Sequence, residues 1–291
     1  MSVAKNRKVS SVEVGNLYCG DSVELLKLVP SRSIDAVVTD PPYNLGQPYD
    51  SFDDRVKLND FTAWVARWAA SVKRVLKLDG TFWLFMGDNV ASQVDVLLQS
   101  MGFRRLSHVV WHYTFGQHNE GNLTPSFTPI FRYGLRRKGQ VFNPDAVRVP
   151  SARQLVYNDK RANPKGRVPD NVWVLRPQEA PAPLFDPSGT VWFQSRLCGT
   201  FKEKRSGSTP NQLPEPLVER ILLLTTRPGA VVLDPFVGSG TVAAVAKRLG
   251  RRYLGFDLSS RYVETARKRL SAVEAPVAKN TRKSPRKAVS N

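Results

Sequence analysis

The sequence predicts an α/β protein with a doubly wound, mostly parallel sheet and an inserted, irregular, basic lobe. Short apolar runs alternate with segments of helical apolar spacing near both ends of the chain. Between about Tyr113 and Pro214, by contrast, Pro, Gly, Asn and basic residues dominate. With 291 residues, 41% of them hydrophobic, the chain can bury one large core. We therefore expect a core domain over 10–272, with 113–213 inserted in it, and a basic disordered tail over 273–291.

The first part of the chain alternates predicted strands and helices. Runs such as SIDAVV and TFWLFM are typical of strands buried on both faces, as in a parallel sheet. FTAWVARWAASVKRVLKL repeats apolar residues at helical spacing and ends before Gly80, which indicates an amphipathic helix. The expected strands are 16–19, 34–39, 81–86 and 106–114, and the expected helices are 21–28, 61–78 and 90–101.

The alternation resumes after the inserted region. PEPLVERILLLTT begins with proline, which the first turn of a helix tolerates, and continues with apolar residues. AVVLD and RYLGFD are short apolar runs, and a helix is expected to start near Thr241 between them. The expected elements are a helix over 214–226, strands over 230–234 and 252–257, and a last helix over 259–272.

The charge balance points to a polyanionic partner. The chain has 43 Lys and Arg against 25 Asp and Glu, a net charge of +18, and residues 130–205 hold 15 basic and 6 acidic residues. Nucleic acid is favoured over a membrane surface, because no basic amphipathic helix accompanies this charge. No apolar run reaches the roughly 18 residues that cross a bilayer. The two cysteines lie far apart, which is typical of a reduced, cytoplasmic protein.

The segment TDPPYN, at 39–44, follows one predicted strand directly. Two consecutive prolines end regular structure, because they remove two backbone donors and fix two φ angles. Asp40 offers a carboxylate and Pro41 a rigid carbonyl, and both would accept hydrogen bonds from the amine of a base and free its lone pair. Tyr43 would stack on a base that has left the duplex. The alternative is a rigid strand exit with a packed tyrosine.

A glycine loop, DPFVGSG, lies between a predicted strand and helix. Gly238 and Gly240 would admit a ligand close to the backbone, and Asp257, 19 residues after Gly238, would bind ribose hydroxyls. Ala243 stands where the third glycine of a dinucleotide fingerprint would fall, which favours an adenosyl cofactor without a pyrophosphate. The alternative is a tight turn followed by an exposed acid.

Together, TDPPYN and DPFVGSGTV resemble the motifs of the S-adenosylmethionine-dependent DNA amino-methyltransferases, which modify exocyclic amines of adenine or cytosine. The catalytic motif comes first and the basic region lies between the two, an order similar to the beta group of that family. The resemblance covers about 16–270. It implies a Rossmann-like methyltransferase fold, S-adenosylmethionine as cofactor, double-stranded DNA as partner, and 113–213 as target-recognition region. It also allows a homodimer, a cognate restriction endonuclease and a nucleoid-associated location.

The resemblance implies a role for each matching residue. Family members often have His-Pro-x-Gln near the cofactor, and here Thr209 replaces the histidine, so any contact of that histidine is in question. The implied catalytic residues are Asp40, Pro41, Pro42 and Tyr43. The implied cofactor-binding residues are Asp21, Asp40, Pro210, Gln212, Asp234, Phe236, Gly238, Ser239, Gly240, Thr241 and Asp257.

Basic residues of the inserted region are the candidates for DNA contact, with a solvated loop as the alternative. His108 and His112 are four apart, but their β-branched and aromatic surroundings favour a strand, so no metal site is expected. Trp64 and Trp68 are expected to pack their helix on the sheet. The expected DNA contacts are Arg153, Lys160, Arg161, Lys165, Arg167, Lys202, Lys204 and Arg205.

The expected reaction is direct methyl transfer to adenine N6 in a specific DNA site. Within the resemblance, Asp at the first catalytic position favours adenine, whereas Ser favours cytosine N4, which stays the first alternative. A non-catalytic DNA-binding protein on the same scaffold is a second alternative, disfavoured by the intact Asp40, Tyr43, Gly238 and Gly240. A nicotinamide oxidoreductase or a protein glutamine methyltransferase would leave the basic region without a role.

Overall fold

One sheet of eight strands organises the molecule. The computed structural model describes residues 9–113, 120–174 and 211–274. The strand order is β1-β8-β7-β2-β3-β5-β4-β6, and only β5 runs antiparallel to its neighbours. The predicted doubly wound, mostly parallel sheet is therefore confirmed. The strands are β1 (Leu17–Cys19), β2 (Ile34–Thr39), β3 (Leu76–Phe85), β4 (Arg104–His112), β5 (Phe127–Gly134), β6 (Val172–Val174), β7 (Val231–Asp234) and β8 (Arg252–Asp257).

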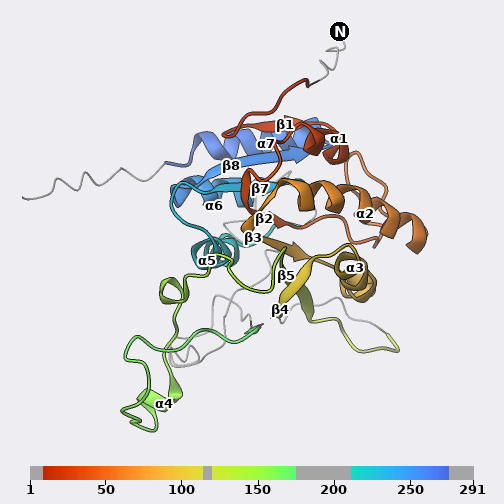
Figure 1. Cartoon of the computed structure of the whole chain (residues 1–291). Coiled ribbons are helices and arrows are strands. Elements are labelled where there is room, and N and C mark those ends of the chain that lie inside the picture. Colours follow the sequence, from red (N-terminus) through yellow and green to blue (C-terminus); the bar gives the residue numbers. More distant parts are fainter. Residues whose placement is uncertain (1–8, 114–119, 175–210, 275–291) are drawn as a thin grey trace, which may run out of the picture.

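Helices cover both faces of the sheet (Figure 1). The helices α1, α2 and α3 pack side by side on one face, and α5, α6 and α7 on the other. Strands β2 and β7 lie between these layers and are buried almost throughout, which explains their continuous apolar runs. The helices are α1 (Ser22–Lys27), α2 (Leu58–Val75), α3 (Asp88–Ser100), a 3₁₀ turn η1 (Pro144–Ala146), α4 (Ala152–Leu155), α5 (Glu215–Thr225), α6 (Thr241–Arg248) and α7 (Ser260–Ser271). None of the helices in the described ranges is long and apolar enough to cross a membrane.

The boundary between α2 and β3 differs from the prediction. The helix was expected to run to Leu78 and end at Gly80, but it ends at Val75 and the strand begins at the next residue. Gly80 lies inside β3, where a Cβ would come within 2.9 Å of the carbonyl oxygen of Asp35 in β2. The glycine therefore permits close strand approach beside the register shift between Ile34 and Ala36, and is not a helix terminator.

The inserted region is less irregular than expected, because it contributes two strands to the sheet. Strand β5 lies between β3 and β4, and the short β6 pairs with β4 at the edge. Strand β5 was not predicted from the sequence, because Pro129 and Arg132 interrupt its apolar pattern and proline is rare inside sheets. The irregular part of the described chain is instead the segment around η1 and α4, which projects away from the sheet (Figure 1).

The strand order creates a switch point at the centre of the sheet. From β2 the chain proceeds to β3 on one side, whereas from β7 it proceeds to β8 on the other. The connections after β2 and β7 therefore diverge and leave a crevice at the carboxyl ends of these two strands. In open α/β sheets, ligands bind at such a crevice.

Candidate active site

Four acidic residues mark the carboxyl ends of four adjacent parallel strands. Asp21 follows β1, Asp257 ends β8, Asp234 ends β7 and Asp40 follows β2, and the strand order makes these neighbours. All four line one cleft, with about 1020 Å³ of empty space including its open mouth. The sequence named each of these acids as a site residue, and the fold brings all four together.

The glycine loop forms one wall of this cleft. Gly238 has a φ of +49°, and its N–H donates to Oδ2 of Asp257 at 2.8 Å. The other carboxylate oxygen of Asp257 accepts from the N–H of Ser259 at 2.9 Å. Asp257 therefore fixes the loop, while its remaining lone pairs face the cleft that it lines. Gly240 has a φ of +78° and caps α6, and a Cβ there would come within 2.7 Å of the Ala266 Cβ.

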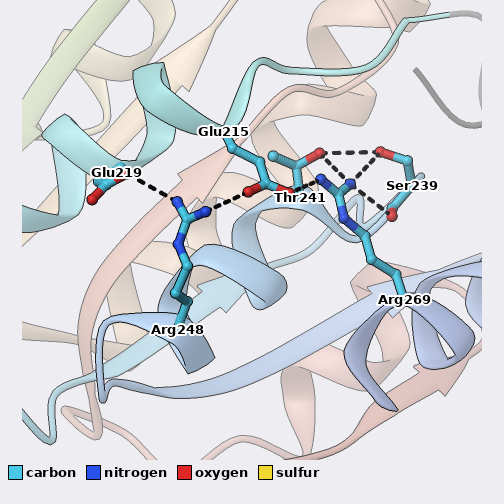
Figure 2. A network of polar contacts seen from close by, with 6 residues as sticks. All are labelled: Glu215, Glu219, Ser239, Thr241, Arg248 and Arg269. Carbon is cyan, nitrogen blue, oxygen red and sulfur yellow. Dashed lines mark hydrogen bonds and ion pairs between the residues drawn. The ribbon is translucent and has the colours of Figure 1, made fainter. Parts of the chain in front are cut away.

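A buried arginine holds the glycine loop from below (Figure 2). The Arg269 side chain, on α7, is 1% exposed, and its guanidinium donates to Thr241 Oγ1 at 2.8 Å and to the Ser239 carbonyl at 3.3 Å. It also pairs with Glu215 of α5, which in turn pairs with Arg248 at 2.7 Å. The network thus joins α5, α6 and α7 at the base of the cleft.

The TDPPYN corner forms the opposite wall. Asp40 and Pro42 line the cleft, whereas Pro41 is buried behind it. Tyr43 is half-buried, does not line the cleft, and donates its hydroxyl hydrogen to Asp40 Oδ1. Burial, and then the charge of Asp40, raise the pKa of Tyr43 well above its usual value, so this hydroxyl stays protonated. Asn89, at the start of α3, donates to the Tyr43 carbonyl at 3.1 Å and holds the corner in place.

Aromatic side chains close the cleft between these walls. Trp64 of α2 lies between Phe52 and Phe236, with ring centroids 5.2 Å and 5.4 Å away. All three rings line the cleft. Trp64 was expected only to pack its helix on the sheet; the fully buried Trp68 does so, whereas Trp64 also faces the ligand space.

The loop 44–57 brings Phe52 to this position. Its centre is Asp54, which is fully buried and accepts hydrogen bonds from the N–H groups of Leu45 at 3.0 Å and Gln47 at 2.9 Å. Asp50 fastens the loop to α7, because it accepts from the Ser259 hydroxyl and lies 3.5 Å from Arg261. The loop is therefore a folded cover over the cleft and not a loose connection.

The cleft is acidic. Burial raises the pKa of Asp234 to about 7, against hydrogen bonds from the Phe236 N–H and the Thr39 hydroxyl that oppose the shift. Burial likewise raises the pKa of Asp257. The described lining holds four Asp and no Lys or Arg. Such a wall repels a pyrophosphate and attracts a cation, and its aromatic rings suit a sulfonium. The residues therefore fit S-adenosylmethionine better than a dinucleotide.

The remaining predicted cofactor residues divide into two groups. Phe236, Ser239 and Thr241 line the cleft as expected. Gln212 is buried beside it and does not line it, although its neighbours Asn211 and Leu213 do. Pro210 lies outside the described residues.

Sequence reasoning missed several residues of the cleft. Tyr49 and Phe52 come from the loop 44–57, and Tyr262 from α7. The Tyr49 hydroxyl is hydrogen-bonded to Asn211, which joins that loop to the segment before α5. No motif marks these positions, since their place follows from the tertiary fold of a polar loop. Their one sequence signal was the concentration of Tyr, Phe and Asp directly after the catalytic motif.

The predicted DNA contacts that lie in the described chain are grouped apart from the cleft, on the projecting segment around α4. Arg153 and Arg161 both pair with Asp159, whereas Lys160 is exposed and forms no ion pair with the described residues. Lys165 pairs with Asp145 at 3.0 Å, and Arg167 with Asp170. Lys202, Lys204 and Arg205 lie outside the described residues.

Comparison with known proteins agrees with this fold, which is that of a Rossmann-like methyltransferase. The chain belongs to the DNA methylase family of N6/N4 methyltransferases, whose model matches residues 34–268. The predicted family is therefore confirmed, and with it the expectations of DNA methylation and of S-adenosylmethionine as methyl donor at the level of the family.

Two relatives of similar sequence cover most of this chain. The Type II methyltransferase M.HpaI of Haemophilus parainfluenzae is 33% identical over 88% of this chain and 74% of its own length. The DNA adenine methyltransferase YhdJ of Escherichia coli K12 is 31% identical over 89% of this chain and 83% of its own length.

Solved structures share the fold at lower identity. The PvuII cytosine-N4-specific DNA methyltransferase has a TM-score of 0.64 at 19% identity, covering 89% of this chain and 87% of that one. A putative DNA modification methylase of Thermus thermophilus, TTHA0409, in complex with S-adenosylmethionine, has a TM-score of 0.58 at 24% identity, with 89% and 93% covered. The two neighbours support the Rossmann-like fold.

Proposed function

We propose that this protein transfers a methyl group from S-adenosylmethionine to the N6 amine of an adenine flipped out of double-stranded DNA. The observation that carries the proposal is the position of Asp40. Its carboxylate lies in the wall of the same cleft as the glycine loop and the aromatic side chains of Phe52, Trp64 and Phe236. An amine bound to Asp40 would therefore lie beside the cofactor.

The chain's own residues perform the activation. S-adenosylmethionine supplies the methyl group on a sulfonium. Asp40 and the Pro41 carbonyl accept hydrogen bonds from the two amine hydrogens, which localises the lone pair on nitrogen. Attack of the amine nitrogen on that methyl group would release the cofactor as an uncharged thioether, and Asp40 or water would take the proton that the methylated amine loses. No nucleophilic cysteine is required, because no covalent enzyme intermediate forms.

Adenine is the preferred target because Asp stands first in the catalytic motif, and because one relative at 31% identity is named a DNA adenine methyltransferase. Cytosine N4 is the second candidate, favoured by the fold neighbour that is cytosine-N4-specific. Both amines need the same activation, so the residues of the corner serve either reaction.

Mass spectrometry of nucleosides tests the choice. DNA lacking methylated bases is incubated with the protein and S-adenosylmethionine and digested to nucleosides. The expected product is N6-methyladenine; N4-methylcytosine alone would reverse the assignment. Absence of both, together with no calorimetric binding of S-adenosylmethionine, would instead support a non-catalytic DNA-binding protein.

The basic residues that the sequence predicted as DNA contacts complete the proposal, as contacts to DNA phosphates in the target-recognition region 113–213. They comprise Arg153, Lys160, Arg161, Lys165 and Arg167 in the described chain, and Lys202, Lys204 and Arg205 outside it. A homodimer, a cognate restriction endonuclease and a cytoplasmic, nucleoid-associated location belong to the same proposal, and size determination in solution tests the first of these.

A further inference from the structure

A second cavity lies on the face of the sheet that carries α5. Its floor is formed by β3, β5, β4 and β6, and its rim by α5 and by residues of the inserted region. Among the described residues, it shares no lining residue with the catalytic cleft. Whereas the described lining of that cleft is acidic, this cavity is lined by two arginines, Arg132 and Arg220.

Arg132 is the unusual residue of this cavity. It is 8% exposed, and its Nε is buried without a hydrogen-bond acceptor in the part of the chain that the structure describes. Within residues 9–113, 120–174 and 211–274, the guanidinium forms no hydrogen bond or ion pair. A guanidinium has five N–H donors, and buried polar groups are normally hydrogen-bonded. Its donors are therefore available to a ligand in the cavity.

Aromatic rings hold this guanidinium in position. Its central carbon lies 4.8 Å from the ring centroid of Phe142 and 5.9 Å from that of Trp83. Trp83 is itself fixed, because its Nε1 donates to Thr225 Oγ1 at 3.0 Å, and Trp173 packs beside it at 6.2 Å. Cation–π contacts orient the charge but leave the N–H donors in the guanidinium plane unused. The site is thus built before any ligand arrives.

The cavity is electropositive. Burial lowers the pKa of Arg132 to about 10, and no carboxylate among the described residues is close enough to oppose this shift. Burial also lowers the pKa of Arg220 to about 9. The acid in the lining, Asp170, is paired with Arg167, which is not part of the lining. An anion bound at Arg132 would therefore supply the counter-charge that this guanidinium lacks among the described residues.

We propose that this cavity is an oxyanion site of the phosphate class, separate from the catalytic cleft, in which Arg132 donates to two oxygens of the ligand. The planar fork of a guanidinium matches such oxygens bidentately. The phosphate group has two sources: a phosphodiester of bound DNA, which rests on the proposed function, or a free phosphate-bearing molecule, which does not.

Thermal unfolding of the full chain in potassium phosphate tests the site directly. KCl is exchanged for phosphate at constant ionic strength, and Arg132→Gln is compared with Arg104→Gln, which changes an exposed arginine at the start of β4. The melting temperature of the wild type and of Arg104→Gln should rise by a few degrees with phosphate, whereas that of Arg132→Gln should not. In KCl alone, Arg132→Gln should melt no lower than the wild type, because it removes an uncompensated buried charge.

The same three proteins are then titrated with a duplex of random sequence at several KCl concentrations. If the slope of log K against log[KCl] is less steep by about 1 in Arg132→Gln but unchanged in Arg104→Gln, the ligand is a DNA phosphodiester. A phosphate response without a change in slope would identify a free anion, and this result stands even if no methyl transfer is found. The proposal fails if phosphate stabilises Arg132→Gln as much as the wild type, or if Arg132→Gln changes neither response. It also fails if this variant melts well below the wild type in KCl, since Arg132 would then already have a partner.

Discussion

In the proposed reaction, the carboxylate of Asp40 is the group on which methyl transfer depends most. Replacing it in Asp40→Ala removes an acceptor for the amine, and we expect kcat to fall about 10²- to 10⁴-fold. Cofactor affinity should stay within a few-fold, because many other residues also line the cleft. Single-turnover methylation and calorimetric titration with S-adenosylmethionine measure the two effects. Equal loss of both would show that Asp40 acts structurally.

The ring and the hydroxyl of Tyr43, which lies beside Asp40, are expected to affect methyl transfer separately. In the ligand-free protein, the Tyr43 hydroxyl hydrogen bonds to Asp40 and so occupies a position that the amine needs. Tyr43→Phe keeps the ring and frees the carboxylate, and should retain methyl transfer within a few-fold. Tyr43→Ala removes the proposed stacking surface, and since stacking is worth about 1–3 kcal/mol per base, kcat/KM for DNA should fall about 5- to 150-fold. If both variants lose activity alike, the hydroxyl and not the ring is essential.

The buried carboxyl of Asp234 makes cofactor binding depend on pH. With its pKa at about 7, this group is largely protonated at pH 6 and ionised at pH 8. A cationic ligand favours the ionised form, so affinity for S-adenosylmethionine should rise with pH, by up to about tenfold between pH 6 and 8. Calorimetry at both pH values measures this. S-adenosylhomocysteine, which lacks the sulfonium charge, should show a smaller change, and Asp234→Asn should show none.

The raised pKa of Asp234 also affects folding: stability should fall as pH rises, whereas cofactor affinity should increase. The folded-state pKa of about 7 lies above the usual 3.8 of a free carboxyl, so the folded protein binds more protons between these values. The contribution of Asp234 to stability is therefore complete below about pH 4 and is lost as pH rises through 7. A cofactor-free Asp234→Asn variant should lack this component in urea unfolding at pH 5 and pH 8.

At the scale of elements, Arg269 of α7 joins its own helix to α6 through Thr241 and to α5 through Glu215 (Figure 2). Arg269→Met leaves the Ser239 carbonyl and Glu215 without its hydrogen bonds, and the loss of a buried partner should cost about 3–5 kcal/mol of unfolding free energy. Arg248→Gln removes a half-exposed pair from the same network and should cost about 0–1 kcal/mol. Urea unfolding compares them. Similar losses in both would mean that burial of Arg269 adds nothing to the network.

Local sequence patterns predicted the strands that carry the motifs. They did not predict strand β5 or the aromatic wall of the cleft, whose positions depend on tertiary packing. Asp40, Asp234 and Asp257 were predictable because each ends or directly follows a strand that reads as an apolar run. Strand β5 was hidden because Pro129 and Arg132 break its pattern, although β3 and β4 pair with it on both sides. The aromatic wall was equally hidden, because Phe52 reaches the cleft only through the hydrogen bonds that Asp54 makes within the loop 44–57.

At the scale of the whole molecule, the cleft lining and the rest of the chain carry charge of opposite sign. The described lining of the catalytic cleft is acidic, whereas the chain as a whole carries +18 and residues 130–205 hold 15 basic against 6 acidic residues. This division suits an enzyme that binds a cationic cofactor in its interior and a polyanion on its surface. The affinities for DNA and for the cofactor can therefore be distinguished by experiment. Salt should weaken exposed contacts to DNA phosphates far more than contacts to the cofactor in the buried cleft.

DNA affinity should therefore fall steeply with salt, with a slope of log K against log[KCl] of about −0.9 for each phosphate contacted. Lys160→Gln removes an exposed lysine that forms no ion pair in the described chain, and it should make the slope less steep by about 1. Asp159→Asn should act in the opposite direction, because Asp159 holds both Arg153 and Arg161, whose hydrogen bonds lower the pKa of its carboxyl. Freed from it, the two arginines can turn to phosphates and raise both affinity and slope. Fluorescence anisotropy with a labelled duplex measures all three proteins, and a slope near zero in the wild type would contradict a phosphate-binding role for this surface.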